Sequence, residues 1–356
     1  MISPRLLSTA SVLFLLLAGA GITANYVVDL PEEDIRVDAL ADVWTGKMTS
    51  RFEEGYEREL PFSGFAVELF NAVSLGIFGE ARKGAIVGRN GWLFTAEEFA
   101  WGRTSEANLD RSFQTITDIR ATLAEKGSTL VIVPVPPKAQ VVAGELGSNV
   151  LPDSNADLYP RFLAFLKERG IPAADVAATF GAAKPEELFL RADTHWTVKG
   201  SGLAAKAACS AIPGRDKLMK TAFESVPQDN VRHVGDLAKF VDAGWMLSGS
   251  QESADIIQPI SAAAKVDDAD ALFAGSDGEA QVMDQVVLVG TSYSANPLWS
   301  FEDQLKTICE VDVLNYAREG KGPFAPMQEF LKALDAQTVP KVVLWEIPVR
   351  YLDDAA

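Results

Sequence analysis

The segment QVVLVGTSYSAN, residues 285–296, joins a continuous apolar run to a Gly-Thr-Ser turn. An unbroken run of β-branched residues is typical of a strand covered on both faces, as in a parallel sheet. Three more runs have this character: TLVIVPVPP at 129–137, VDVLNYA at 311–317 and KVVLWEIP at 341–348. Together these four runs predict a buried, mostly parallel sheet.

Helical patterns separate the predicted strands. They are ANLDRSFQTITDIRATLAEKG at 107–127, ADLYPRFLAFLKERG at 156–170 and APMQEFLKALDAQ at 325–337. Alternating strands and helices predict a doubly wound α/β domain, in which functional groups lie in the loops beyond the carboxyl ends of the strands. The polar, irregular stretch 213–283 is interpreted as an insertion with surface loops.

Composition limits the possible partners. The chain has 356 residues, of which 48% are hydrophobic, so it can bury a full core. Its formal charge is -17, from 32 basic and 49 acidic residues. Binding to phosphate backbones needs clustered Lys and Arg, so a nucleic-acid partner is not expected.

The N-terminus reads as a targeting segment. The 23 residues between Arg5 and Asp29 carry no formal charge and follow a single basic residue. Such a run is a signal peptide or an uncleaved signal anchor, and both place the rest of the chain across the membrane. We expect this segment to occupy 1–28, a helical segment to occupy 29–85, and the α/β domain to occupy 86–356.

Ser292 follows a predicted strand at a turn opened by glycine, which would expose its hydroxyl at the sheet edge. A serine becomes nucleophilic when a neutral imidazole takes its proton, and a carboxylate orients that imidazole. The stretch RADTHWTVKG, 191–200, can supply both groups, because Asp193 and His195 would point to the same side if this loop is extended. Each motif alone also fits a structural role, since the serine could cap a helix and the Asp-His pair could stabilise a loop.

Few other residues could form a disulfide or bind a metal. Cys209 and Cys309 could form a disulfide in an oxidising compartment, closing a loop worth up to about 4 to 5 kcal/mol. The two cysteines and two histidines show no zinc spacing. His233 and Asp236 lack a third ligand nearby, so a structural role is preferred for them and neither a metal nor a cofactor is expected.

Five ordered blocks resemble one known family: GRNGWLF, RADTHWT, VGTSYS, VLNYAREGKGPFAPM and LWEIPVRYL. They look like the alginate O-acetyltransferases AlgJ and AlgX, whose catalytic domain is a permuted relative of the SGNH hydrolases. The resemblance is closer to AlgJ, because the chain ends shortly after the last block. It implies a three-layer α/β/α fold, with Ser292 as nucleophile, His195 as base and Asp193 as the residue that orients it.

The resemblance also implies a cellular location, an acceptor and partner proteins. It predicts a periplasmic protein, anchored to the inner membrane, that acetylates an exopolysaccharide such as alginate. Acetyl-CoA is cytoplasmic, so a membrane-bound O-acyltransferase is the expected acetyl donor, alongside other exopolysaccharide biosynthesis proteins. Two alternatives stay open: a carbohydrate esterase or deacetylase with the same triad, and a non-catalytic scaffold in a polysaccharide secretion complex.

Four further residues are candidates for binding substrate or the oxyanion. Asn315 and Arg318 follow the neighbouring strand and could face the acyl oxygen or the sugar. Tyr293 and Trp196 flank the proposed triad and could stack on a sugar. Each has a structural alternative, a turn at the strand end for Asn315 and core packing for the two aromatic residues.

Overall fold

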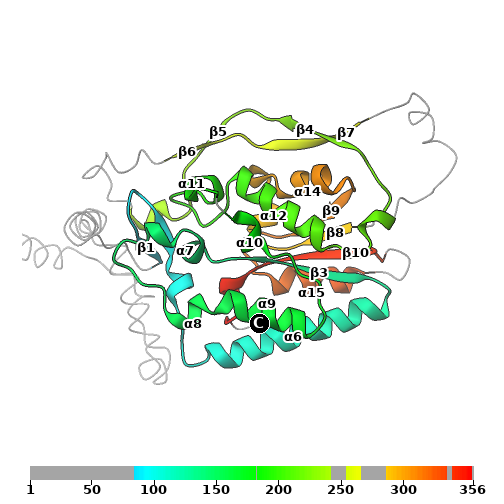
Figure 1. The fold of residues 1–356 in the computed structure, drawn as a ribbon, viewed down its shortest axis with the longest axis horizontal. Helices are drawn as coiled ribbons and strands as arrows, with labels where there is room; N and C mark the ends of the chain where they lie inside the picture. Colours follow the sequence, from blue (N-terminus) through cyan, green and yellow to red (C-terminus); the bar gives the residue numbers. More distant parts are fainter. Residues whose placement is uncertain (1–83, 182, 242–253, 266–285, 335–338, 355–356) are drawn as a thin grey trace, which may run out of the picture. The chain divides into compact units, whose positions relative to one another are not determined.

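A four-stranded parallel sheet forms the centre of the protein in the computed structural model (Figure 1). Its strand order is β3 (Thr129–Val135), β10 (Val342–Pro348), β8 (Val286–Val289) and β9 (Val313–Asn315). In register, Val342 pairs with both Thr129 and Val286. The four apolar runs of the sequence are therefore the four strands, as predicted.

The structure describes residues 84–181, 183–241, 254–265, 286–334 and 339–354. The predicted targeting segment at 1–28, and nearly all of the predicted helical segment at 29–85, lie outside this part of the chain. Within it, every helix is too short or too polar to cross a bilayer.

Helices cover both faces of the sheet, because successive strand side chains point to opposite sides. On one face, Val131 and Val133 pack against α10 (Val176–Phe180), α12 (Val198–Ala211) and α14 (Phe301–Cys309). On the other, Leu130 and Ile132 pack against α6 (Ser105–Glu125), α9 (Leu158–Glu168) and α15 (Phe324–Ala333). This arrangement confirms the three-layer α/β/α architecture (Figure 1).

Short elements connect these layers. They comprise a β1–β2 hairpin (Ala85–Val87 and Leu93–Thr95), the helices α7 (Lys138–Val141), α8 (Asp153–Ala156), α11 (Pro185–Leu188) and α13 (Ser292–Ala295), and the 3-10 helices Ala96–Phe99, Ala143–Glu145, Arg215–Lys217, Ala238–Phe240, Pro297–Trp299 and Val349–Tyr351. Several of them carry residues of the site described below.

The stretch 213–283 contains two antiparallel strand pairs in its described residues. β4 (Phe223–Pro227) pairs with β7 (Ile260–Ala264), and β5 (Val231–His233) pairs with β6 (Asp255–Ile257). The chain therefore leaves the sheet after α12, forms these ribbons and returns to it at β8. This excursion brings His233 towards the loop that holds His195.

A disulfide joins Cys209 near the end of α12 to Cys309 at the end of α14. Both sulfur atoms are buried in the core that covers one sheet face. The helix α12 begins just after His195, and α14 follows the turn that holds Ser292. The bond therefore links the two chain segments from which the proposed nucleophile and base come.

Candidate active site

The turn after β8 places Ser292 at the first position of α13. Thr291 caps this helix, and its amide N–H donates to Glu346 Oε2 at 2.8 Å. A side chain at position 290 would meet that carboxylate, since a Cβ there would lie 2.5 Å from Glu346 Oε2 and 2.9 Å from Ser294 Oγ. Gly290 is thus required for the close approach of the turn to Glu346.

The Glu346 carboxyl group is completely buried beneath this turn. Its oxygens accept hydrogen bonds from the amide and hydroxyl of Thr291 and from the hydroxyl of Ser294. Burial raises the pKa of Glu346 to about 7, although these hydrogen bonds act in the opposite direction. The group fixes the backbone from which Ser292 projects.

Ser292, His195 and Asp193 form a continuous hydrogen-bonded chain. Ser292 Oγ lies 2.7 Å from His195 Nε2, and His195 Nδ1 lies 2.6 Å from Asp193 Oδ1. A carboxylate only accepts hydrogen bonds, so Nδ1 carries the proton and Nε2 presents its lone pair to the serine hydroxyl. This is the tautomer that a general base for serine needs.

The second oxygen of Asp193 has its own partners. His233 Nε2 lies 2.7 Å from Oδ2, and the amide N–H of Asp236 donates to it at 3.0 Å. Asp236 in turn accepts from the amide and hydroxyl of Thr194. Burial alone would raise the pKa of Asp193, but hydrogen bonds from His195 and His233, together with the charge interaction with His195, outweigh it and hold the pKa below its usual range.

Aromatic rings enclose the imidazole of His195. Trp299 stacks on it with ring centroids 4.9 Å apart, and Tyr293 lies 4.7 Å away at a tilt. The Tyr293 hydroxyl donates to the carbonyl of Thr194 and accepts from Arg350, which is itself buried. These contacts restrict the ring to the orientation that faces Ser292.

A buried lysine holds the backbone of the Asp-His loop. Lys138 is 1% exposed, and burial lowers its pKa to about 7. Its ammonium nitrogen lies 2.7–2.9 Å from the carbonyl oxygens of Leu93, Leu190, Arg191 and Asp193, which share its three N–H donors. The side chain of Glu98 accepts the amide N–H groups of Lys138 and Ala139. Lys138 thus ties the loop before His195 to β2.

Three residues around the proposed triad also form a candidate metal-binding cluster. Asp193, His195 and Asp236 bring three potential ligand atoms within 4.8 Å of one another. Hydrogen bonds within the site use His195 Nδ1 and both carboxylate oxygens of Asp236. We therefore interpret the cluster as a hydrogen-bonded network.

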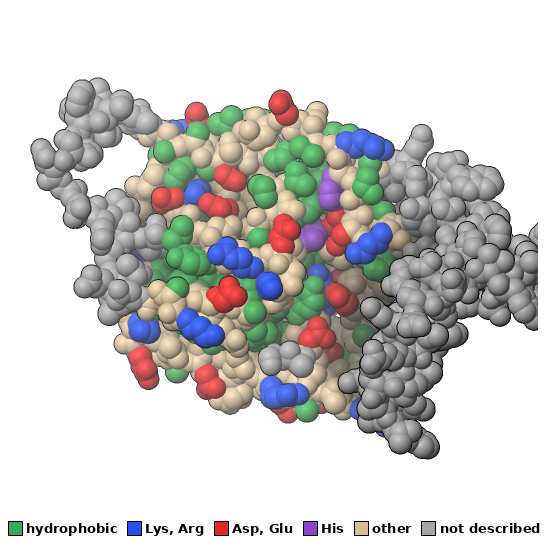
Figure 2. Space-filling model, turned by 180° about the vertical axis from the view of Figure 1, so that it is seen from behind, with side chains coloured by type: hydrophobic (Ala, Val, Ile, Leu, Met, Phe, Trp, Pro, Cys, Tyr) green, Lys and Arg blue, Asp and Glu red, His purple; other side chains and the backbone are tan. Residues whose placement is uncertain are grey.

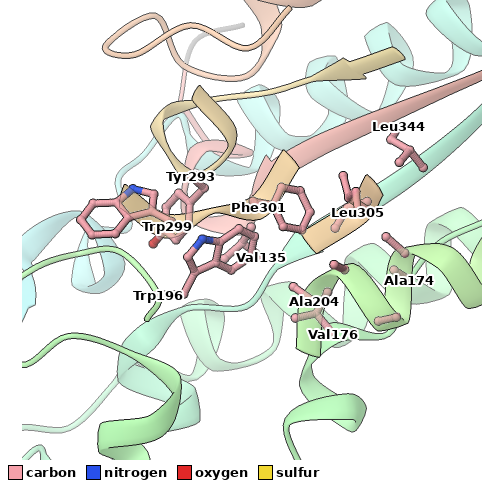
Figure 3. Close-up of a cluster of buried hydrophobic side chains, with 14 of the residues drawn as sticks. Val135, Ala174, Val176, Trp196, Ala204, Tyr293, Trp299, Phe301, Leu305 and Leu344 are labelled. Carbon is pink, nitrogen blue, oxygen red and sulfur yellow. The ribbon is translucent and has the colours of Figure 1, made fainter. Parts of the chain in front are cut away.

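Two of the predicted sugar-stacking residues are in the core instead. Trp196 is fully buried and Tyr293 is 1% exposed, and their rings contact each other edge to face with centroids 5.0 Å apart (Figure 3). Neither ring has a free face for a sugar. Apolar packing takes both rings into the core between the sheet and α12, so the predicted sugar-stacking role is wrong.

The two other candidates occupy different environments. Both N–H groups of the Asn315 amide face protein acceptors, the Ser294 carbonyl at 2.8 Å and the Glu302 carboxylate at 3.2 Å. Asn315 therefore positions the turn and has no donor left for an oxyanion. Arg318 has an exposed side chain, and its amide N–H donates to the Gly290 carbonyl, so it lies beside the nucleophile turn.

Sequence reasoning missed the contribution of His233, Asp236 and Glu346. His233 and Asp236 lie in the stretch RHVGDL, 232–237, and nothing local to it indicates that it reaches Asp193. Glu346 gave a better signal, because it is a single acidic residue within an otherwise apolar buried strand. Figure 2 shows that both histidines of the chain reach one face of the molecule, next to acidic side chains.

Comparisons with known proteins agree with this geometry. A family model described as "SGNH hydrolase-like domain, acetyltransferase AlgX" matches residues 85–349. A "Probable alginate O-acetylase AlgJ" of Pseudomonas syringae pv. tomato is 37% identical over 318 residues, covering 87% of this chain and 80% of that protein. The protein of the same name from Pseudomonas aeruginosa is 32% identical over 325 residues, covering 87% and 81%.

Solved structures give the same result. The O-acetyltransferase domain of Pseudomonas putida AlgJ has a TM-score of 0.68 at 35% identity, covering 76% of this chain and 93% of that one. Pseudomonas aeruginosa AlgX has a TM-score of 0.60 at 22% identity, covering 76% and 67%, and supports the fold alone. The chain therefore belongs to the AlgX-type acetyltransferase family with an SGNH hydrolase-like domain, and it is more similar to the AlgJ proteins than to AlgX.

Proposed function

We propose that this chain transfers acetyl groups, through an acetyl-serine at Ser292, to hydroxyl groups of an exopolysaccharide such as alginate. The hydrogen-bonded chain from Asp193 through His195 to Ser292 is the observation that carries the proposal. The relatives named as alginate O-acetylases support alginate as the acceptor.

In the first half-reaction, Ser292 Oγ attacks the carbonyl carbon of a donor acetyl group. Its proton passes to His195 Nε2 and then to the leaving group, while Asp193 stabilises the imidazolium. The developing oxyanion needs donors at this point, and the backbone N–H of Ser292 at the start of α13 is our candidate. The products are acetyl-Ser292 and the protonated leaving group.

In the second half-reaction, the acceptor hydroxyl gives its proton to His195 Nε2 as its oxygen attacks the acetyl carbon. The bond between that carbon and Ser292 Oγ breaks, and the serine regains its proton from His195. Transfer prevails over hydrolysis when the sugar hydroxyl, rather than water, is held in line with His195. Arg318 is our candidate for contacting the sugar, because it is exposed beside the nucleophile turn.

The cellular location of the chain and the source of its acetyl groups are part of the same proposal. The uncharged run between Arg5 and Asp29 supports an uncleaved anchor in the inner membrane, with the domain in the periplasm. A membrane-bound O-acyltransferase would then supply acetyl groups, and other exopolysaccharide biosynthesis proteins would present the polymer. N-terminal sequencing of the mature protein tests the anchor, because cleavage would give a chain that starts near Gly21.

Intact mass spectrometry after incubation with p-nitrophenyl acetate tests the acyl-enzyme. We expect the wild-type chain to gain the mass of one acetyl group and to pass it to alginate oligosaccharides. Ser292→Ala should show no adduct and should lose turnover by a factor on the order of 10³ or more.

Ser294→Ala is the matched control for this experiment. Ser294 lies in the same helix, but its hydroxyl points to Glu346. This variant should still form the acetyl adduct. An adduct that persists in Ser292→Ala and disappears in Ser294→Ala would overturn the assignment of the nucleophile.

A further inference from the structure

The carboxylate of Asp193 accepts hydrogen bonds from two histidine rings. His195 occupies Oδ1 through its ring and its amide, while the ring of His233 and the amide of Asp236 occupy Oδ2. The carboxylate is 1% exposed, so these donors replace its hydration. Because it can only accept, His233 must hold a proton on Nε2 even when its ring is neutral.

The two rings differ in what surrounds them. His195 is stacked on Trp299 and faces Ser292, whereas His233 contacts the edge of Trp299 and has a side chain that is 19% exposed. His233 also lies among more carboxylates, since Asp255 is its partner in the β5–β6 ribbon. The charged groups that act on His233 and its neighbours are Asp193, Asp236, Asp255, Arg191 and Lys138.

We propose that His233 is a positioning residue that takes the first proton of the His195–Asp193–His233 group and so keeps His195 neutral, as a free base, at lower pH. This inference rests on the proposed function of Ser292 and His195. A hydrogen bond to Asp193 and the nearby carboxylates raise the pKa of His233. Once His233 is cationic, a second positive charge on the other side of the same carboxylate is disfavoured.

As a consequence, the acid limb of the plot of kcat/KM against pH lies at lower pH than it would without the charge on His233. His195 has to lose its proton before it can accept one from Ser292. A cation on His233 disfavours a second positive charge on the nearby His195 ring, and we expect this repulsion to displace the acid limb by on the order of one pH unit. Removing the charge of His233 while keeping its hydrogen bond should therefore move the acid limb upwards by the same amount.

His233→Gln is the variant that separates these effects. The Gln side chain can donate to Asp193 Oδ2 through its amide but does not titrate near neutral pH. We expect the acid limb of kcat/KM for p-nitrophenyl acetate to rise by about one pH unit. His233→Ala also removes the hydrogen bond, so kcat should fall by about tenfold or more with little change in KM.

Arg232→Gln is the matched control. Arg232 is the preceding residue of β5, is exposed and points to the opposite face of the strand, so it tests a general loss of one positive charge. The acid limb should stay in place in this variant. An unchanged limb in His233→Gln, or one that moves downwards, would overturn the proposal.

Ring titration by NMR tests the order of protonation without catalysis. The full chain has only two histidines, so a sample with labelled histidine and no polyhistidine tag gives one set of signals for each ring. We expect His233 to protonate first on acidification, and His195 to protonate at higher pH in His233→Gln than in wild type. If His195 protonates first, the proposal is wrong even when the enzyme is active.

The same titration separates the two proposals. If the order of protonation is as expected but Ser292 forms no acetyl adduct, the charge sharing stands and the proposed function fails. This wild-type measurement also tests the proposal if His233→Gln does not fold.

Discussion

At the scale of single residues, Glu346 beneath the nucleophile turn makes the stability of the fold depend on pH. Its carboxyl group is fully buried with a pKa of about 7, against 4.5 when exposed. The folded state therefore binds a proton between these two values that the unfolded state has released. Stability from this group is present below pH 4.5 and is lost as pH rises to about 7, a change of about 3 kcal/mol.

Glu346→Gln should remove this pH dependence. The Gln carbonyl can accept from Thr291 and Ser294 as the carboxylate does, and its amide can donate to the Thr291 hydroxyl. Between pH 5 and pH 8, the free energy of unfolding of wild type should fall relative to the variant by up to about 3 kcal/mol. Urea denaturation across this range measures the difference, and parallel pH curves would show that Glu346 does not titrate in this way.

At the scale of elements, the strands were predictable because both faces of the sheet are covered. Each strand then appears as a continuous apolar run, as in Val286–Val289, and the loop after it was expected to carry function. This rule identified Ser292, and the short spacing of Asp193 and His195 identified the other two members of the chain. Spacing within one loop is local information, so sequence was sufficient for it.

Contacts between distant elements were not predictable in the same way. His233 reaches Asp193 only because the β5–β6 ribbon folds back over the loop before α12. Tyr293 and Trp196 have the composition of a sugar-binding surface, but the packing of α12 against α14 puts them in the core. The side-chain amide of Asn315 is bonded to the Ser294 carbonyl in α13 and to the Glu302 carboxylate in α14, and the strand that carries Asn315 gives no local sign of either contact.

The disulfide between α12 and α14 carries a prediction at this scale. Cys209 and Cys309 are 100 residues apart, so the bond removes about 4 to 5 kcal/mol of loop entropy from the unfolded chain. The double variant Cys209→Ser with Cys309→Ser should lose stability of this order, because it lacks the constraint. Guanidinium denaturation with and without a reductant measures it.

Reduced wild type is the control for the double variant. It should approach the same stability, whereas the variant itself should not respond to the reductant. A wild-type midpoint that is insensitive to complete reduction would contradict the expected contribution of the bond.

At the scale of the whole molecule, charge opposes the acceptor that the family suggests. The chain has a formal charge of -17, and a uronate polymer such as alginate carries a carboxylate on each sugar. Repulsion of this kind acts over about 30 Å at 0.01 M salt but only about 8 Å at 0.15 M. The encounter of enzyme and polymer should therefore depend on ionic strength, while the chemistry at Ser292 should not.

We accordingly expect kcat/KM for a uronate oligosaccharide to rise several-fold between about 0.01 M and 0.15 M salt. The value for p-nitrophenyl acetate, which is uncharged, should change by less than about twofold over the same range. Initial rates of both reactions in one salt series provide the comparison. If the rate with uronates falls as salt increases, positively charged side chains near the site outweigh the net negative charge of the chain. Arg318→Ala then tests whether the exposed Arg318 guanidinium beside Gly290 is one of these side chains. In that case the variant should lose the salt dependence and much of the transfer to uronates while retaining ester hydrolysis, because Arg318 bonds to the backbone carbonyls of Ala317 and Gly290 and its role would be confined to the polymer.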